Sequence, residues 1–191
     1  MAFLSREALL EIGFKSLGEE VLLSEKASIY NPAKIELGSH IRIDDFCILS
    51  AGEGGIFIGN YVHVACYASL VGAGRIELHD FCGIATRTAI LSATDDFSGA
   101  HLMGPTVPDA FRAVTIAPVV LHSHVIIGAG CIVLPGVHLA AGTAIGAMSL
   151  VARSITEAGI YAGIPVQKIR ERGTRIFELE QNLLHQQRKR S

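Results

Sequence analysis

Aliphatic side chains recur at every sixth position over most of the chain. A period of six differs from the 3.6-residue period of an amphipathic helix and from the two-residue alternation of a strand. It is typical of a triangular solenoid, in which each six-residue segment forms one face and turns its aliphatic side chain inward. The residue that follows is often small or acidic, which suits a tight corner. The recurring positions are Leu37, Ile43, Leu49, Ile58, Val64, Leu70, Leu78, Ile84, Ile90, Leu121, Ile127, Val133, Leu139, Ile145 and Val151.

The repeat is interrupted at three places. Extra residues near Glu53-Gly54-Gly55 and Gly72-Ala73-Gly74 predict short loops at corners of the solenoid. Between Ile90 and Leu121 the chain exceeds the repeat by about 25 residues, which predicts a projecting loop over residues 92–116. A loop of that length in a compact solenoid is usually functional.

Helical patterns flank the repeat. Ser5 is a good N-cap for a short helix that ends at Gly13, and Ile176, Leu179 and Leu183 form an apolar stripe on a helix over residues 174–187. We expect this second helix to cover the open end of the solenoid or, alternatively, to contact another subunit. The expected organisation is one all-β solenoid domain over residues 1–191. It has an N-terminal cap (1–26), coils (27–157) and a C-terminal turn and helix (158–191).

Composition agrees with a packed aliphatic core. Half of the 191 residues are hydrophobic, yet only 6% are aromatic and Trp is absent. The net charge is −2, and the basic residues near the C-terminus do not alternate with aromatic residues, so we expect no nucleic-acid partner. Gly, Pro and His interrupt the apolar stretch 114–148, so we expect no membrane span. The first residues lack the pattern of a signal peptide, and we expect a cytoplasmic protein.

The four cysteines, Cys47, Cys66, Cys82 and Cys131, lie far apart in the sequence. No two of them form a CxxC pair, which argues against a zinc ribbon or a redox pair. We expect four reduced, packed thiols.

Several segments of the C-terminal half carry a family resemblance. They are Val125-Ile126-Ile127-Gly128-Ala129-Gly130, Leu134-Pro135-Gly136-Val137, Ile145-Gly146-Ala147-Met148-Ser149 and Tyr161-Ala162-Gly163-Ile164-Pro165. Together with the repeat, they resemble the hexapeptide-repeat acyltransferases of the maltose, galactoside and lipopolysaccharide-sugar acetyltransferase group, over roughly residues 37–170. The resemblance implies a left-handed parallel β-helix. It also implies acetyl transfer from acetyl-CoA to a sugar hydroxyl or amino group in surface polysaccharide biosynthesis.

The resemblance further implies a homotrimer that binds acetyl-CoA in a groove between two subunits, with no metal. Transferred onto this sequence, the thiol arm of CoA passes the backbone at Gly128, Ala129 and Ala147. The cations near its phosphates are Arg153, Lys168 and Arg170. Small residues let pantetheine approach the wall of the coil, and cations suit phosphate. Each of these residues also has a purely structural reading, as a corner residue or a solvated surface charge.

The catalytic base is the open question. The maltose and galactoside branch carries a His at the start of the projecting loop, but the corresponding segment here is Ala93-Thr94-Asp95-Asp96. Three solutions are open: Asp95 or Asp96 acts as a base with its pKa raised by burial, His101 reaches the groove, or the acceptor is an amine that needs less help. His63 and Tyr67 are candidates for contact with the sugar. The two aspartates also suit a plain loop turn.

Two other functions are compatible with a solenoid of this kind. A γ-class carbonic anhydrase would need three converging metal ligands, and the chain has eight His but lacks that family's H-x4-H spacing. A non-catalytic scaffold is also possible, because the fold does not fix the function. The projecting loop and the basic residues beyond the last coil favour the acetyltransferase.

Overall fold

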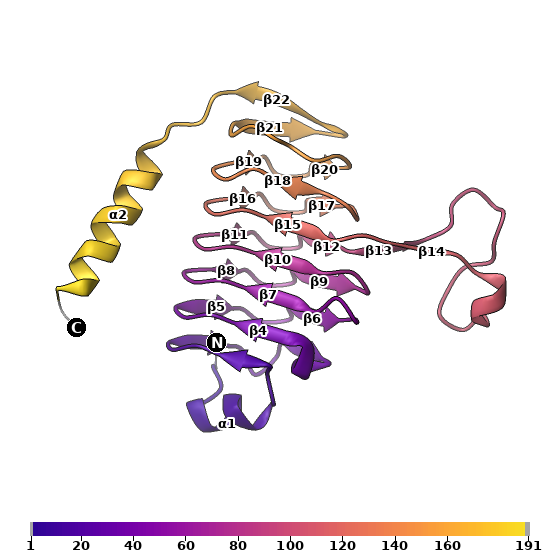
Figure 1. Cartoon of the computed structure of the whole chain (residues 1–191), viewed down its shortest axis with the longest axis horizontal. Coiled ribbons are helices and arrows are strands. Elements are labelled where there is room, and N and C mark those ends of the chain that lie inside the picture. The colour runs from indigo at the N-terminus through magenta and orange to yellow at the C-terminus, as the bar shows by residue number, and fades with distance from the viewer. Residues whose placement is uncertain (1, 190–191) are drawn as a thin grey trace.

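The computed structural model describes residues 2–189 and shows a three-sided prism of stacked parallel strands (Figure 1). Each coil contributes one short strand to each face, and successive coils stack in register. Leu37, Ile58, Leu78, Leu121 and Leu139 follow one another in this way, each at most 2% exposed. Burying one such side chain contributes about 1.5–3 kcal/mol. The period-six pattern therefore predicted the parallel β-solenoid correctly.

The strands form three long sheets, one for each face. The first face contains β1 (Ser16–Leu17), β4 (Ile35–Leu37), β7 (Ile56–Ile58), β10 (Ile76–Leu78), β15 (Val119–Leu121) and β18 (His138–Leu139). The second contains β2 (Val21–Leu23), β5 (Ile41–Ile43), β8 (His63–Val64), β11 (Gly83–Ile84), β16 (Ile126–Ile127), β19 (Ala144–Ile145), β21 (Ile160–Gly163) and β22 (Val166–Arg170). The third contains β3 (Ser28–Tyr30), β6 (Ile48–Ala51), β9 (Ser69–Gly72), β12 (Ala89–Leu91), β17 (Ile132–Val133) and β20 (Leu150–Val151).

The corner between the first and second faces, here called the helix corner, carries a column of stacked rings. His40, Tyr61, Phe81 and His124 occupy the same place in successive coils, with φ angles of 57°, 57°, 62° and 63°. Bulky residues rarely adopt this left-handed conformation. Their rings stack with centroids 4.4, 4.8 and 4.9 Å apart, which offsets the cost of the backbone conformation.

The corner between the third and first faces, here called the loop corner, holds the three insertions that interrupt the repeat. The two short glycine-containing loops lie there, and the third insertion leaves the prism as an arm (Figure 1). Its base is the antiparallel pair β13 (Ala93–Asp95) and β14 (Val114–Ile116), and a short 3₁₀ helix, η2 (Asp109–Phe111), lies near its tip. The arm occupies the stretch for which a projecting loop over residues 92–116 was predicted.

The N-terminal end is covered by α1 (Arg6–Glu11), whose N-cap Ser5 accepts a hydrogen bond from the Ala8 backbone N–H at 3.2 Å. Leu9 of this helix is buried. The first coil already begins at β1, so the expected boundary between cap and coils at residues 26/27 is wrong. The 3₁₀ turn η1 (Pro32–Lys34) shifts the register before β4 and hides the earlier repeats in the sequence.

The C-terminal helix α2 (Arg175–Arg188) does not cover the open end, contrary to expectation. The antiparallel pair β21–β22 continues the second face there, beyond the expected end of the coils at residue 157. From this end α2 runs back along the side of the prism (Figure 1). Phe177 packs edge-on against His124 with ring centroids 4.9 Å apart, and Glu180 binds the Nε2 atom of His124 at 2.7 Å. The helix is therefore a strap on the helix corner.

Three cysteines, Cys47, Cys82 and Cys131, are buried, and Cys66 is half-buried; all four thiols are free. Burial raises the pKa of Cys47 to about 11 and that of Cys82 to about 12. These thiols therefore stay protonated and pack as small apolar groups. No helix within residues 2–189 is long and apolar enough to cross a membrane.

Candidate functional site

The base of the arm forms a cleft of about 360 Å³. The residues that line it are Thr94, Asp95, Asp96, Phe97, Gly99 and Met103. Much of this lining is apolar, and the Phe97 side chain is 93% exposed. Asp95 and Asp96 are the two carboxylates that reach the cleft, so the segment that replaces a His-containing motif does line a hollow.

The two aspartates have different surroundings. Asp96 accepts hydrogen bonds from the Ser98 backbone N–H at 2.8 Å, the Ser98 hydroxyl at 2.9 Å and the His101 backbone N–H at 3.0 Å. These bonds, those of Ser98 first, lower the pKa of Asp96 to about 2. The expectation that burial raises its pKa is therefore wrong for Asp96, which is used to hold the loop turn. Within residues 2–189, no other side chain bonds the carboxylate of Asp95, which is left available to a ligand.

His101 is drawn to the same turn. Its Nδ1 atom lies 3.4 Å from the Asp96 carboxylate, and its side chain is 49% exposed. It does not line the cleft with Asp95. In this structure His101 thus supports the loop together with Asp96.

A second hollow, of about 270 Å³, lies on the second face and runs to the corner between the second and third faces, here called the groove corner. Three outward-facing positions of successive coils form one of its walls. They are His63, Gly83 and Ile126, which are in register with one another. Gly83 has no side chain, so an open space is left between the other two. The residues that line it are His63, Ala65, Gly83, Ile84, Ala85, Thr86 and Ile126.

The three positions expected to border the thiol arm of CoA continue this corner. Ile84 is in register with Ile127, so Gly128 lies directly above Ala85, and Ala129 follows it in the same coil. Ile127 is in register with Ile145, so Ala147 lies above Ala129 in the next coil. A Cβ atom on Gly128 would lie 2.5 Å from the Ala147 backbone nitrogen. Close stacking of the coils therefore requires this glycine whether or not a ligand passes it.

Tyr67 also lies on the groove corner, where its side chain is half-exposed and its φ angle is 63°. Its ring stacks on Phe46 at 5.0 Å, and the Arg87 guanidinium lies 5.5 Å from its centroid. Tyr67 is therefore one step along the corner from the hollow, although it does not line it.

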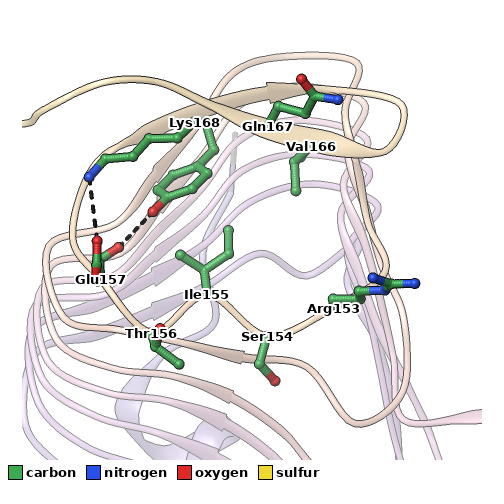
Figure 2. A pocket seen from close by; sticks show the side chains of 9 residues that line it. Arg153, Ser154, Ile155, Thr156, Glu157, Val166, Gln167 and Lys168 are labelled. Carbon is green, nitrogen blue, oxygen red and sulfur yellow. Dashed lines mark hydrogen bonds and ion pairs between the residues drawn. The ribbon is translucent and has the colours of Figure 1, made fainter.

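The basic residues gather at the C-terminal end of the prism. Arg153 and Lys168 line a hollow of about 280 Å³, and Figure 2 shows them on opposite sides of it. Lys168 is paired with Glu171 at 2.6 Å and Glu157 at 3.6 Å, and the hydrogen bond to Glu171 raises its pKa. Within residues 2–189, no acidic side chain pairs with Arg153. Arg170, also on β22, is not among the residues that line this hollow.

Sequence reasoning missed Asp44. Its side chain is buried, binds His63 Nε2 at 2.9 Å and Arg42 Nε at 2.7 Å, and comes from the coil below His63. Burial would raise the pKa of Asp44, but the hydrogen bonds from Arg42 and His63 outweigh it and hold the pKa below its ordinary value. The only sequence signal for Asp44 was an acidic residue directly after a buried aliphatic one, as in Ile43-Asp44. The same pattern is equally typical of a residue that only forms a corner.

The candidate residues thus fall into separate groups. Asp95, Asp96 and His101 belong to the arm at the loop corner, whereas His63, Tyr67, Gly128, Ala129 and Ala147 belong to the second face and the groove corner. One chain does not bring the two groups together. Residues 2–189 hold no cluster of three or more His, Cys, Asp or Glu side chains that could bind a metal ion.

Comparison with known proteins gives consistent relatives. The chain is 44% identical over 180 residues to the dTDP-4-amino-4,6-dideoxy-D-glucose acyltransferase of Escherichia coli, covering 94% of each protein. WbbJ of Escherichia coli strain K12, named for O-acetyl transfer in lipopolysaccharide biosynthesis, is 32% identical over 145 residues, which is 70% of this chain and 67% of WbbJ. No family model matches the chain.

Among solved structures, the N-acyltransferase AntD of Bacillus cereus, in complex with dTDP and 3-hydroxybutyryl-CoA, superposes with a TM-score of 0.93 at 48% identity. The match covers 97% of this chain and 98% of AntD. The relatives are sugar acyltransferases, not carbonic anhydrases or scaffolds, so those two alternatives are set aside. The implied cofactor is an acyl-CoA. The small residues of the groove corner would leave room for its thiol arm, and the Arg153 side chain would suit its phosphates. The chain belongs to the β-solenoid family of sugar acyltransferases.

Proposed function

We propose that this enzyme transfers an acyl group from acyl-CoA to the amino group of a dTDP-linked amino sugar. The observation that carries this proposal is the 44% identity, over 94% of both proteins, to a dTDP-4-amino-4,6-dideoxy-D-glucose acyltransferase. AntD, which has been solved with both dTDP and an acyl-CoA, supports it. The similarity to the O-acetyl transferase WbbJ is weaker and covers less of the chain. An amino acceptor is therefore favoured over a hydroxyl.

The replacement of the loop histidine by aspartates fits an amino acceptor. A sugar hydroxyl must lose its proton as it attacks, whereas an amine is nucleophilic once its ammonium form has given up one proton. Asp95 is the available carboxylate in the cleft of the arm. We assign it to binding the ammonium group and accepting that proton. Asp96 and His101 hold the loop in place around it.

CoA binding is assigned to two regions of the prism. Gly128, Ala129 and Ala147 border the thiol arm, and Arg153 at the C-terminal hollow, free of acidic partners among the described residues, binds phosphate. Lys168 and Arg170 contribute positive charge near it. Acyl-CoA supplies the activated thioester, and the chain supplies the walls and charges that orient it.

A trimer would unite the two groups of residues. The arm exposes Phe97, Met103 and Phe111 by 93%, 67% and 60%, which is unusual for a projecting segment in water. Packing the arm against the groove corner of a neighbouring copy would cover these side chains. It would also bring Asp95 to the hollow beside Gly83. Cyclic symmetry repeats this contact three times.

We place the enzyme in the cytoplasm, where acyl-CoA and nucleotide sugars are made, and its product in surface polysaccharide biosynthesis. The acceptor panel is dTDP-4-amino-4,6-dideoxyglucose, its 4-hydroxy counterpart and maltose, each with acetyl-CoA or 3-hydroxybutyryl-CoA. Release of the CoA thiol measures turnover, and mass spectrometry identifies an amide or an ester. We expect turnover only with the amino sugar. Acylation of a hydroxyl acceptor in preference to the amine would refute the proposal.

A further inference from the structure

The hollow of the groove corner is lined by one member of a pair of titratable side chains that no part of the proposed function uses. His63 lines the hollow, and its side chain is half-exposed. Its Nε2 atom lies 2.9 Å from Asp44 Oδ2, while Asp44 Oδ1 receives a hydrogen bond from Arg42 Nε at 2.7 Å. The Asp44 side chain is only 9% exposed. Both carboxylate oxygens are therefore occupied, and the carboxylate is fixed in direction.

This arrangement determines which nitrogen of His63 carries the proton. An ionised carboxylate accepts hydrogen bonds only, so the neutral ring must donate to it from Nε2–H. Nδ1 is then the unprotonated nitrogen of the ring. A buried carboxylate that fixes the tautomer of a histidine and stabilises its protonated form is the arrangement that prepares the ring for proton transfer.

The surroundings of His63 leave room for a ligand on its exposed side. The next residue of the column is Gly83, which has no side chain, and the small residues Ala65 and Ala85 line the same hollow. Gly128 and Ala129, the positions assigned to the thiol arm of CoA, follow Ile126 and Ile127 in the coil above Ala85 and Thr86, which line the hollow. The reactive end of that arm would thus arrive beside His63.

We propose that His63, oriented by Asp44, carries the proton from the attacking nitrogen to the departing sulfur; this rests on the proposed function. The sugar ammonium first loses one proton to Asp95, which passes it to solvent. The amine then bonds to the thioester carbon, and His63 Nδ1 takes one proton from the positively charged nitrogen. As the carbon–sulfur bond breaks, His63 returns that proton to the CoA thiolate. The products are the amide and the free CoA thiol, with one proton released to solvent.

The first test compares His63→Ala with a matched control, His79→Ala. His79 makes the same kind of contact, from Nε2 to Glu77 at 3.2 Å, but follows β10 on the first face, away from the hollow. We expect His63→Ala to lower kcat by about 10²- to 10³-fold, with KM for acyl-CoA within about threefold of wild type. The control should retain wild-type kinetics. Added imidazole should restore the kcat of His63→Ala by about tenfold and leave the control unchanged.

The second test concerns Asp44 as a positioning residue. In Asp44→Asn the amide can donate to Nε2, which turns the ring to the Nδ1–H tautomer and removes its free acceptor. We expect a loss in kcat of at least about tenfold with a folded trimer. Nitrogen-15 NMR should show the neutral His63 ring protonated on Nε2 in the wild type and on Nδ1 in the variant.

The NMR measurement also separates this proposal from the proposed function. If the wild type transfers no acyl group to the amino sugar, the proposed function fails, and the His63 signals are then followed as CoA is added. A shift on adding CoA, absent for His79, supports the placement of His63 at the thiol end. Any one of three results would overturn the proposal. They are a wild-type kcat in His63→Ala, absence of rescue by imidazole, and His63 NMR signals that do not shift when CoA is added.

Discussion

The two consecutive aspartates at the base of the arm, Asp95 and Asp96, have different roles. Asp96 accepts three hydrogen bonds from Ser98 and His101, and they hold its carboxylate in the ionised form. Such local bonds are what makes Asp a common turn residue. Asp95 is one position earlier, at the end of a strand; it lines the same cleft, but no other side chain of residues 2–189 bonds its carboxylate. The sequence pair Asp-Asp cannot reveal this difference, because it depends on where the turn begins.

This difference predicts unequal effects on turnover. Asp95→Asn keeps the size of the side chain but cannot take a proton, so kcat should fall by about 10²- to 10⁴-fold. Asp96→Asn keeps one acceptor oxygen for the turn, so its kcat should fall by less than about tenfold. Steady-state release of CoA thiol from both variants checks this, with His101→Ala as the comparison. Equal losses in the two aspartate variants would mean that both act only through the loop.

Acid stability should depend on Asp44. Its pKa is lowered from an ordinary value of 3.8, so its ionised form stabilises the folded state above that pH, and the contribution is lost as pH falls through the lower folded-state value. Asp44→Asn should cost about 1–3 kcal/mol at pH 7, because a charged acceptor of two hydrogen bonds is lost. Thermal unfolding between pH 7 and pH 3 measures this. The gap in Tm between wild type and variant should narrow as the pH drops below about 4.

At the scale of elements, α2 packs against the prism through one side of the helix. Phe177 and Glu180 contact His124 and the side chain of Gln187 donates to the Tyr61 hydroxyl, while no residue of α2 is buried. The Leu179 side chain remains 52% exposed. The helix is therefore a weakly held strap, and the prism has its own continuous core.

Loosening α2 should leave the prism intact. Phe177→Ala removes the ring that packs on His124, and we expect faster hydrogen exchange in α2 with little change in the core strands. The matched change Leu78→Ala opens a cavity in the core and should destabilise the whole prism by about 2–5 kcal/mol. Hydrogen exchange resolved by segment distinguishes the two. Faster exchange throughout the prism of Phe177→Ala would show that α2 is part of the core.

The elements differ in how far the sequence predicts them. The coils and the arm follow from the six-residue period and its interruption, because the inward Ile, Leu and Val side chains of the strands stack on equivalent residues of the next coil. The place of α2 does not follow, because its stripe of Ile176, Leu179 and Leu183 fits several surfaces equally well. The position of α2 is set by the contact of Phe177 with the ring of His124, which lies about fifty residues earlier in the sequence. The Asp44–His63 pair is likewise a contact between coils, invisible in either local segment.

At the scale of the whole molecule, the proposed trimer rests on the separation of the two groups of site residues. The cleft of the arm lies at the loop corner and the hollow beside Gly83 lies on the second face, and they share no residue. The first face is a poor match for the apolar arm. It carries a charged network in which Arg75 binds Glu36 and Glu77 at 3.0 Å each. The arm, with its exposed apolar side chains, is better matched by the apolar groove corner of another copy.

Mixed trimers test whether two copies share one site. Gly83→Leu should fill the hollow without breaking the strand, since a Cβ there meets Ile126 only at 3.6 Å, an ordinary contact. Asp95→Ala disables the arm, and each variant alone should be inactive. Co-expressed in equal amounts, the two would form an intact groove facing an intact arm at about one quarter of their interfaces, restoring about one quarter of wild-type kcat. Differently tagged subunits and native mass spectrometry establish that mixing occurred. Because a site contained within one chain would be damaged in every subunit, a mixed trimer without turnover would show that the arm serves its own prism.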